Sequence, residues 1–330
     1  MLQYLIILLD DTSTSYCHYG NERAGRRLIA LEDLKAGIFF AMKENLMIQF
    51  VYPDYELPQA YKDAIQSIDH SDFVSSTCED ASLRRQADVV VYHGFSALRD
   101  KQPEAGTTCV LRTTKAELFQ QYAALKDLLP RLTRLNVVIT DVETFTGADF
   151  ETYRDVLTAL AAVVEQCYVD RKSPQLNLLT DRMMLERMNN CNAGVENITF
   201  APDGRFYICP AFYLAGDEED YGLGKAKFSI GDLEHGLDVK SPQLYRLDHA
   251  PLCHRCDAYQ CKRCVWLNRK TTYEVNTPGH EQCVVAHLER NASRSLLANI
   301  RRHGTFLPGH EIEEIDYLDP FDVKDRWERD

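Results

Sequence analysis

YLIILLDDTSTSYCHY, residues Tyr4 to Tyr19, sets the fold class of this chain of 330 residues. An apolar run from Leu2 to Leu9 ends abruptly at Asp10. The run is too short for a transmembrane helix, which needs about 20 apolar residues, and it lacks the basic leader of a signal peptide. We therefore interpret it as the buried first strand of a cytoplasmic protein, followed by a polar loop.

Further short apolar runs have the pattern of buried parallel strands, and helix-period segments lie between several of them. The predicted strands are Leu46 to Val51, Asp88 to Tyr92, Thr108 to Leu111, Leu135 to Ile139 and Gln175 to Leu179. The predicted helices are Leu31 to Lys43, Lys115 to Leu129 and Phe150 to Val169. This alternation predicts a parallel sheet with helical crossovers, either an open doubly wound sheet or a partial (β/α)6 barrel.

The composition is that of a globular protein, with 45% hydrophobic and 26% charged residues. A chain of this length has room for two domains. Its formal net charge of -13 makes nucleic acid and anionic membrane surfaces poor partners and favours a basic or neutral peptide. Eleven cysteines in a cytoplasmic protein are expected to be metal ligands or buried thiols rather than disulfides.

The regular alternation stops after Asn190, where cysteines become frequent. Asp203-Gly204 lies between two alternating runs and predicts a β-hairpin. An acidic loop, Ala215 to Gly224, follows, and His280 to Arg302 is a predicted helix. We therefore divide the chain into residues 1–190, residues 191–304 and an acidic C-terminal tail, residues 305–330.

Two cysteine pairs, Cys253 with Cys256 and Cys261 with Cys264, are separated by only four residues. Thiolates at this spacing can turn towards a common metal site, and the neighbouring arginine and lysine side chains would lower their pKa values. A single zinc ion is the alternative, although zinc ribbons space their pairs by about 12 to 20 residues. Haem attachment is excluded because no histidine follows either pair.

Three more cysteines flank these pairs in a specific order. Twelve residues separate Cys191 from Gly204, four more precede Cys209, and Cys283 follows the pairs. This arrangement resembles the SPASM domain, the C-terminal extension of peptide-modifying radical SAM enzymes. The gap between the pairs and the second pair are each one residue shorter than in the commonest form of that family. The resemblance implies a radical SAM-like (β/α)6 barrel followed by a small cysteine-rich α+β domain.

The same resemblance implies two auxiliary [4Fe-4S] clusters with interleaved ligands. Cys191, Cys209 and Cys264 would hold the first cluster, and Cys253, Cys256, Cys261 and Cys283 would hold the second. The first cluster would then have three thiolates, and its fourth iron would be open to substrate or held by another residue. An open iron binds a substrate thiolate or amide, whereas a closed cluster supports structure or electron transfer.

The radical SAM motif itself is missing. That motif places three cysteines after the first strand, so that one iron of the cluster can chelate S-adenosylmethionine. Here Asp10 and Thr14 occupy two of the positions, and only Cys17 remains. The loop after the second strand, Tyr52 to Glu56, also lacks the Gly-Gly-Glu run of the family. We therefore expect no binding or cleavage of S-adenosylmethionine.

The remaining candidate residues have modest interpretations. Cys17 and His18 are a possible remnant metal or redox pair, and His254 and His287 are expected to pack or to hydrogen-bond rather than to bind metal. Asp141 and Glu143 are candidates for chemistry, or alternatively a helix cap and a surface charge. Cys78, Cys109 and Cys167 are expected in the core. The C-terminal ends of the strands should gather Asp10, Tyr52, His93, Asp141 and Thr180 in a cleft.

Tyr4 to Tyr19, together with the seven C-terminal cysteines, resembles the CXXX repeat peptide maturase family. This resemblance implies maturation of a ribosomally synthesised peptide with a cysteine at every fourth residue, beside a true radical SAM maturase of the same pathway. The leading hypothesis is a cluster-bearing partner of that enzyme. The alternatives are a stand-alone peptide-modifying redox enzyme that uses an open auxiliary cluster, and a zinc-stabilised peptide-binding module.

Overall fold

The computed structural model describes residues 2–21, 23, 25–214, 228–307, 309 and 311–312. The predicted acidic loop from Ala215 to Gly224 and most of the predicted C-terminal tail therefore lie outside the described residues. No helix in the described part of the chain is long and apolar enough to cross a bilayer.

One sheet of 11 strands, counted over the described residues, runs through the molecule in the order β11-β10-β9-β8-β1-β2-β3-β4-β5-β6-β7. Strands β1 to β7 are parallel and neighbour one another in sequence order, and β8 pairs in parallel with the other side of β1. Strands β9, β10 and β11 add antiparallel pairs. The strands are β1 Tyr4–Leu8, β2 Met47–Val51, β3 His70–Ser75, β4 Val89–His93, β5 Thr108–Thr113, β6 Arg134–Ile139, β7 Gln175–Leu176, β8 Asn197–Phe200, β9 Arg205–Tyr207, β10 Ser229–Asp232 and β11 Gly236–Leu237.

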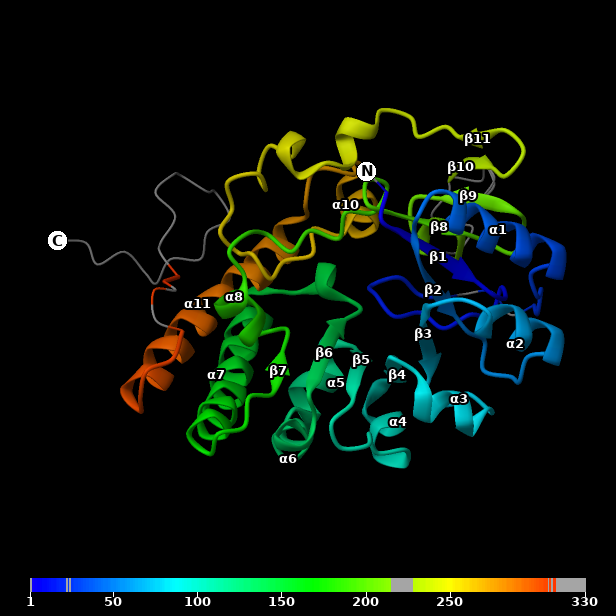
Figure 1. Cartoon of the computed structure of the whole chain (residues 1–330). Coiled ribbons are helices and arrows are strands. Elements are labelled where there is room, and N and C mark those ends of the chain that lie inside the picture. Colours follow the sequence, from blue (N-terminus) through cyan, green and yellow to red (C-terminus); the bar gives the residue numbers. More distant parts are fainter. Residues whose placement is uncertain are drawn as a thin grey trace.

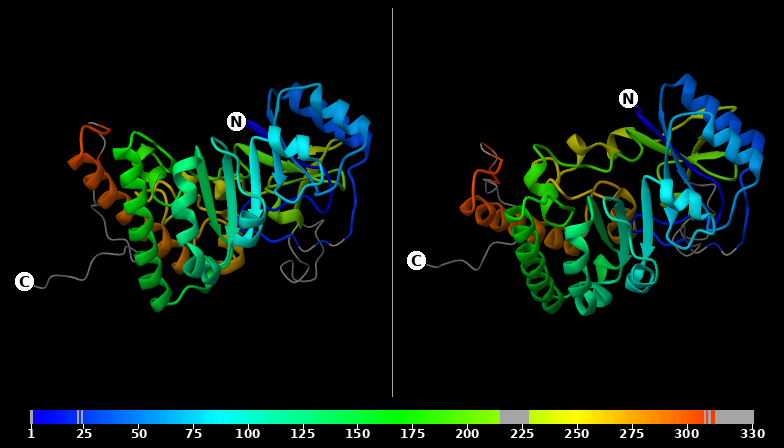
Figure 2. Two further views of the ribbon diagram at one scale, coloured as in Figure 1. Left: turned by 90° about the horizontal axis from the view of Figure 1, so that it is seen from below. Right: turned by 60° about the horizontal axis from the view of Figure 1, so that its bottom comes forward.

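Helices connect the parallel strands and lie on the outside of the curved sheet (Figures 1 and 2). The α-helices are α1 Leu31–Lys43, α2 Gln59–Gln66, α3 Ala81–Gln86, α4 Gly94–Asp100, α5 Lys115–Gln121, α6 Ala123–Leu128, α7 Gly147–Val169, α8 Thr180–Met184, α9 Ala211–Leu214, α10 Val265–Thr272 and α11 His280–Arg302. Short 3-10 helices are η1 Leu129–Arg131, η2 Val142–Thr144, η5 Pro242–Tyr245 and η6 Leu247–His249. Helix α11 packs beside α7 (Figure 1).

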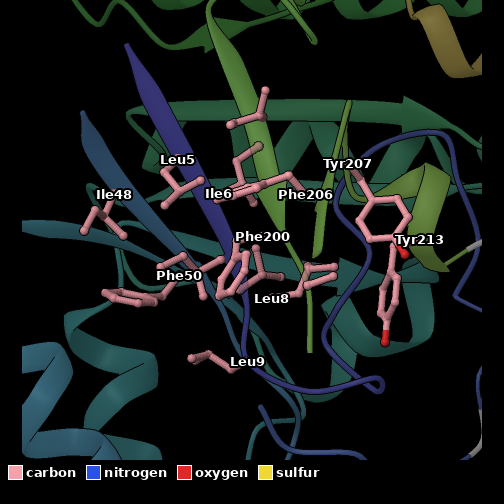
Figure 3. Close-up of a cluster of buried hydrophobic side chains, with 14 of the residues drawn as sticks. Leu5, Ile6, Leu8, Leu9, Ile48, Phe50, Phe200, Phe206, Tyr207 and Tyr213 are labelled. Carbon is pink, nitrogen blue, oxygen red and sulfur yellow. The ribbon is translucent and has the colours of Figure 1, made fainter. Parts of the chain in front are cut away.

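The first strand lies at the centre of the larger hydrophobic cluster (Figure 3). Leu5 and Ile7 on β1 are fully buried, as is Phe200 on the neighbouring β8. Each such side chain contributes roughly 1.5–3 kcal/mol through removal from water. Helix α1 approaches this layer closely, because a Cβ atom at Gly37 would lie 2.9 Å from the ring of Phe200. A second cluster lies between β5, β6, α7 and α11.

The structure confirms the predicted fold class, a parallel α/β sheet with helical crossovers. The hairpin also forms, with Gly204 in a turn at a φ of +78°. Three predictions were wrong in detail. Of the strand predicted from Gln175 to Leu179, only Gln175 and Leu176 form β7. Strand β3 was missed because its residues are mostly polar, and the predicted helix from Lys115 to Leu129 breaks at Tyr122 between α5 and α6.

The predicted division near Asn190 stays a prediction. The sheet continues across it, because β8 follows this position and pairs with β1 through Tyr4 to Ile7. The cysteine-rich segment therefore shares its backbone hydrogen bonds with the first strand of the barrel. Any variant that loosens this segment acts on an element attached to the central strand.

Candidate metal centre

Four cysteines line one enclosed cavity: Cys253, Cys256, Cys261 and Cys283. The first three lie in the turns before α10, and Cys283 lies in the first turn of α11. They are the residues that the sequence grouped as ligands of the second cluster. The cavity is also lined by Arg263 and His287, so a guanidinium and an imidazole line the same space as the four cysteines.

The other three predicted ligands, Cys191, Cys209 and Cys264, pack together against the hydrophobic cluster around β1. Burial raises the pKa of Cys209, and the negative charges of Cys264 and Cys191 raise this pKa further. Burial also raises the pKa of Cys264, and the negative charge of Cys191 raises it further. Because charge interactions weaken with distance, these mutual effects mark the three thiols as neighbours. Cys191, Cys209 and Cys264 therefore lie near one another, and the other four cysteines line the cavity; their division between two clusters stays a prediction.

Backbone N–H groups point at the sulfur atoms in both groups. The amides of Ala258 and Arg263 each lie 3.4 Å from a sulfur, that of Cys256 and that of Cys261 respectively. Hydrogen bonds from the backbone also lower the pKa values of Cys191, Cys209 and Cys264, against the larger raising effect of burial. Such amide-to-sulfur bonds stabilise thiolates and tune iron–sulfur clusters. The donor set thus fits metal-bound thiolates.

No three His, Cys, Asp or Glu side chains within the described ranges converge closely enough to hold a single metal ion. His254 and His287 each have a hydrogen-bond partner within the protein. His254 Nδ1 lies 3.0 Å from the carbonyl oxygen of Ala250, and His287 Nε2 lies 3.5 Å from the sulfur of Cys256. Both histidines have the packing and hydrogen-bonding positions that the sequence led us to expect.

Arg263 lies between the two cysteine groups and is fully buried. Burial lowers the pKa of its guanidinium, while the charges of Cys253, Cys191 and Cys261 raise it. Its Nε donates to Asn190 Oδ1 over 2.8 Å, and its Nη2 donates to the carbonyl oxygen of Tyr245. A permanent positive charge is therefore held next to thiols of both groups, where it offsets the negative charge of thiolate-bound clusters.

The loop after β1 contains a hydrogen-bonded polar network where radical SAM enzymes carry their catalytic cysteines. Asp10 is completely buried and accepts from the amide of Thr12 (2.8 Å) and from the hydroxyl of Tyr55 (2.9 Å). Thr14 Oγ1 lies 2.9 Å from His93 Nε2. These partners satisfy the side chains of Asp10 and Thr14, which stand at two of the positions where the radical SAM motif has cysteines.

Arg112 on β5 extends this network. Its Nη1 lies 3.1 Å from His93 Nδ1. Burial lowers the pKa of His93 to about 4, and the charge of Arg112 contributes to this lowering. Since arginine can only donate, His93 accepts at Nδ1 and carries its proton on Nε2, which donates to Thr14. The imidazole is therefore neutral at pH 7 and locked in one tautomer.

A cavity opens at the C-terminal ends of β4, β5 and β6. Its lining includes His93, Arg112 and Thr140 from these strand ends, and Trp266 and Lys270 from α10. The cleft was therefore predicted at the correct end of the sheet. Arg112, Trp266 and Lys270 were missed, because nothing in their own sequence surroundings marks them as cavity residues.

Most of the side chains predicted for this cleft have other partners. Of the five, His93 lines the cavity. Thr180 is buried and bonds the backbone of Leu176 (2.9 Å), and Asp141 accepts from the amide of Lys115 (2.8 Å) at the start of α5. Glu143 pairs with Lys270 Nζ at 2.9 Å. Asp141 thus matches the helix-cap alternative, whereas Glu143 is a partly buried partner of Lys270 rather than a surface charge.

The core cysteines are where the sequence predicted them. Cys78 and Cys109 are fully buried, and Cys167 is 3% exposed on α7. Burial is the main cause that raises the pKa of each of these thiols. They are therefore protonated packing residues at pH 7.

Comparison with known proteins gives matches among solved structures alone. No protein-family model and no curated protein matches the chain. The structure of anSMEcpe with bound AdoMet and Cp18Cys peptide is similar with a TM-score of 0.57 and 11% identity, covering 92% of this chain and 100% of that chain. The structure of anSMEcpe with bound AdoMet and Kp18Cys peptide has a TM-score of 0.59 and 12% identity, covering 91% of this chain and 99% of that one.

Streptococcus suis SuiB bound to precursor peptide SuiA gives a TM-score of 0.40 and 13% identity, covering 64% of this chain and 60% of that chain. The anSMEcpe protein is an anaerobic sulfatase-maturating radical SAM enzyme with a SPASM domain. At these identities the likeness concerns the fold. This chain has the fold of a radical SAM enzyme with a SPASM domain, built without the radical SAM cysteine motif.

Proposed function

We propose that this protein acts in the maturation of a ribosomally synthesised cysteine-repeat (CXXX) peptide, as a cluster-bearing partner of an active radical SAM enzyme. One observation carries this function. The chain keeps the whole architecture of anSMEcpe, a radical SAM enzyme crystallised with AdoMet and a peptide, but has Asp10 and Thr14 where the catalytic cysteines belong.

Two iron–sulfur clusters fit the cysteine groups. Cys253, Cys256, Cys261 and Cys283 would hold one, and Cys191, Cys209 and Cys264 would contribute to the other. Clusters of this kind supply electron transfer or local structural support. The chain's own part is to hold the thiolates, which the backbone amides and the buried charge of Arg263 favour.

The peptide would bind in the cavity at the strand ends. Arg112 and Lys270 supply positive groups, His93 supplies a neutral imidazole, and the ring of Trp266 supplies an apolar surface. Such a lining can hold peptide carbonyl groups, a carboxylate and an apolar side chain. Arg112 and Lys270 place positive charge in this cavity, although the whole chain has a net charge of -13.

Cleavage of S-adenosylmethionine is not part of this function. A reductive cleavage needs three thiolates on one cluster in the loop after β1, and this loop contains one cysteine, Cys17. We expect the pure, reduced protein to form no 5'-deoxyadenosine above a cluster-free control. Formation above that control would contradict the role of a partner and would support an enzyme in its own right.

The function is tested by anaerobic purification followed by iron, sulfide and zinc analysis and by calorimetry with a synthetic cysteine-repeat peptide. The expected protein is brown, contains iron and sulfide, and binds the peptide. The peptide mass should change in the presence of an active radical SAM maturase and stay constant without it. A change in mass with this protein alone would favour the stand-alone redox enzyme. Stoichiometric zinc without iron would favour the zinc-stabilised module.

A further inference from the structure

Cys17 follows the first strand by nine positions in the sequence, yet it lies with cysteines from the other end of the chain. Its side chain packs against the hydrophobic cluster around β1, as do those of Cys191, Cys209 and Cys264. All four side chains are partly buried. The loop after β1 therefore brings one cysteine to the layer that contains the three ligands predicted for the first cluster.

The backbone around Cys17 is fixed by the opposite side of the barrel. Arg112 Nε donates to the carbonyl oxygen of Cys17 over 2.8 Å, and its Nη2 donates to that of Tyr19. His18 Nδ1 lies 3.0 Å from the carbonyl oxygen of Ile139 at the end of β6. These bonds hold the backbone from Cys17 to Tyr19 against the ends of β5 and β6. The position of Cys17 is thus set by hydrogen bonds with β5 and β6 as well as by its own loop.

The same segment faces the residues that follow Cys264. His18, Tyr19 and Trp266 line one cavity, so the chain next to Cys17 and the chain next to Cys264 form its walls. Cys264 itself is the residue that precedes α10. Residues next to Cys17 and next to Cys264, which are 247 positions apart in the numbering, therefore line one cavity, and both cysteines pack against the same hydrophobic cluster.

The electrostatic influences agree with this placement. Burial raises the pKa of Cys17, and among its neighbours the charges of Cys191 and Cys264 raise this pKa most. The charge of Cys17 in turn raises the pKa of Cys209. Each of the three predicted ligands is therefore close enough to Cys17 for the thiolate charges to interact.

We propose that Cys17 is the fourth protein ligand of the first cluster, together with Cys191, Cys209 and Cys264. The inference rests on the proposed iron–sulfur function of these cysteines. On ligation the Cys17 thiol gives up its proton to solvent and its sulfur forms a bond to iron, without any change in oxidation state. A neighbouring cationic iron removes the mutual repulsion that disfavours four thiolates in one buried place.

A fourth thiolate closes the first cluster. A closed cluster has no iron available for a peptide thiolate, so the peptide contacts the cavity rather than the metal. The last cysteine of the vanished radical SAM motif has then become part of the auxiliary site. The loop after β1 is tied through this bond to the C-terminal segment.

The test compares the anaerobically reconstituted wild type with Cys17→Ala and with the control Cys167→Ala, in which the thiol lies on α7 outside both groups. Iron and sulfide are counted, and the EPR spectra of the reduced proteins are recorded with and without added 2-mercaptoethanol. In the wild type and in Cys167→Ala the thiol should leave the spectrum unchanged. In Cys17→Ala the first cluster should lose iron or give a spectrum that shifts with the thiol.

Three results separate the possible failures. A wild type with clusters, and a Cys17→Ala variant with the same iron content and the same thiol-insensitive spectrum, overturns the ligand role alone. A thiol-dependent spectrum of the wild type also overturns it, and this measurement needs no variant that might misfold. A wild type that takes up no iron overturns the proposed clusters themselves and the ligand role with them.

Discussion

The loop after β1 and the cysteine-rich segment before α11 are both irregular in backbone structure, but different contacts stabilise them. Both must hold irregular backbone inside the protein. In the loop, the Tyr55 hydroxyl and the Thr12 amide donate to Asp10, and His93 donates to Thr14, so protein groups satisfy these buried side chains. In the cysteine-rich segment, short turns and the start of α11 surround a cavity lined by four cysteines.

This difference indicates which part of the fold depends on metal. The loop lies on β1, whose apolar residues are buried between β2 and β8 whether or not a cluster is present. The segment from Cys253 to Cys264 has no strand and no α-helix of its own. Where regular hydrogen bonding is sparse, metal binding is part of the folding free energy. We therefore expect removal of the ligands to damage the segment far more than changes in the loop.

The largest effect is expected from Cys253→Ser or Cys261→Ser. Loss of one ligand should remove one of two clusters, about half of the bound iron, and unfold the surrounding turns because metal ligation is part of their stability. Iron analysis and limited proteolysis measure the two effects. Cys167→Ala is the matched control and should retain all iron. Full iron content in both ligand variants would contradict the cluster assignment.

Arg263→Met should have the next largest effect. It leaves Asn190 Oδ1 and the carbonyl oxygen of Tyr245 without their donor. Losing hydrogen bonds to a charged group costs roughly 1.5–3 kcal/mol for each bond. Removing the positive charge also disfavours the reduced, more negative clusters, so the midpoint potential should become more negative.

Arg263→Lys separates the two roles of this side chain. Lysine keeps the charge but not the planar fork that serves two acceptors. Its midpoint potential should stay near that of the wild type, while its stability in denaturant titrations falls. Equal potentials for Arg263→Met and the wild type would show that the guanidinium has no electrostatic effect on the clusters.

The sequence predicted the parallel α/β frame because that frame depends on local patterns, whereas the division of the cysteines between two clusters comes from the family resemblance and stays a prediction. The unbroken apolar run of β1 and the spacing of the seven cysteines are visible without any long-range information. Strand β3 was missed because Ser71 and Asp72 interrupt its apolar pattern, although it forms between β2 and β4. Its neighbours in the sheet, not its own residues, determine its conformation.

The position of Cys17 could not be predicted for a related reason. It depends on Arg112, which follows it by 95 positions and holds its carbonyl oxygen. It also depends on the packing of Cys264 and Trp266 against the same region. Contacts between residues so far apart in the sequence leave no periodicity or spacing pattern that a reader of the sequence could use. The missed residues of the cavity, Arg112, Trp266 and Lys270, share this property.

Within the loop, Thr14→Val should have a smaller effect than either change in the cysteine-rich segment. It removes the acceptor of His93 Nε2–H while keeping the side-chain volume. A single neutral hydrogen bond contributes about 1 kcal/mol, so the free energy of unfolding should fall by about this amount. Iron content should not change. A loss of iron in Thr14→Val comparable to that in Cys253→Ser would mean that iron binding depends on the loop as much as on the cysteine-rich segment.

The smallest effect concerns the protonation of His93. Its pKa is lowered to about 4 by burial and by the charge of Arg112, whereas in the unfolded chain the value is about 6.5. Between these values the unfolded state binds more protons than the folded one, so stability rises with pH across this window. The contribution is complete above about pH 6.5 and is lost as the pH falls towards 4. Because part of His93 remains in contact with solvent, which screens its charge, we expect the free energy of unfolding to change by less than about 1 kcal/mol.

NMR titration of the imidazole measures this pKa directly, in the wild type and in Arg112→Gln. Glutamine removes the charge, so the pKa of His93 should rise towards its ordinary value. The same variant loses one donor to the carbonyl oxygens of Cys17 and Tyr19, and therefore loosens the segment next to the proposed ligand. If the first cluster includes Cys17, Arg112→Gln should also alter the EPR spectrum of that cluster, whereas Thr14→Val should not. An unchanged EPR spectrum in both variants would show that the hydrogen-bond network of the loop has no effect on the first cluster.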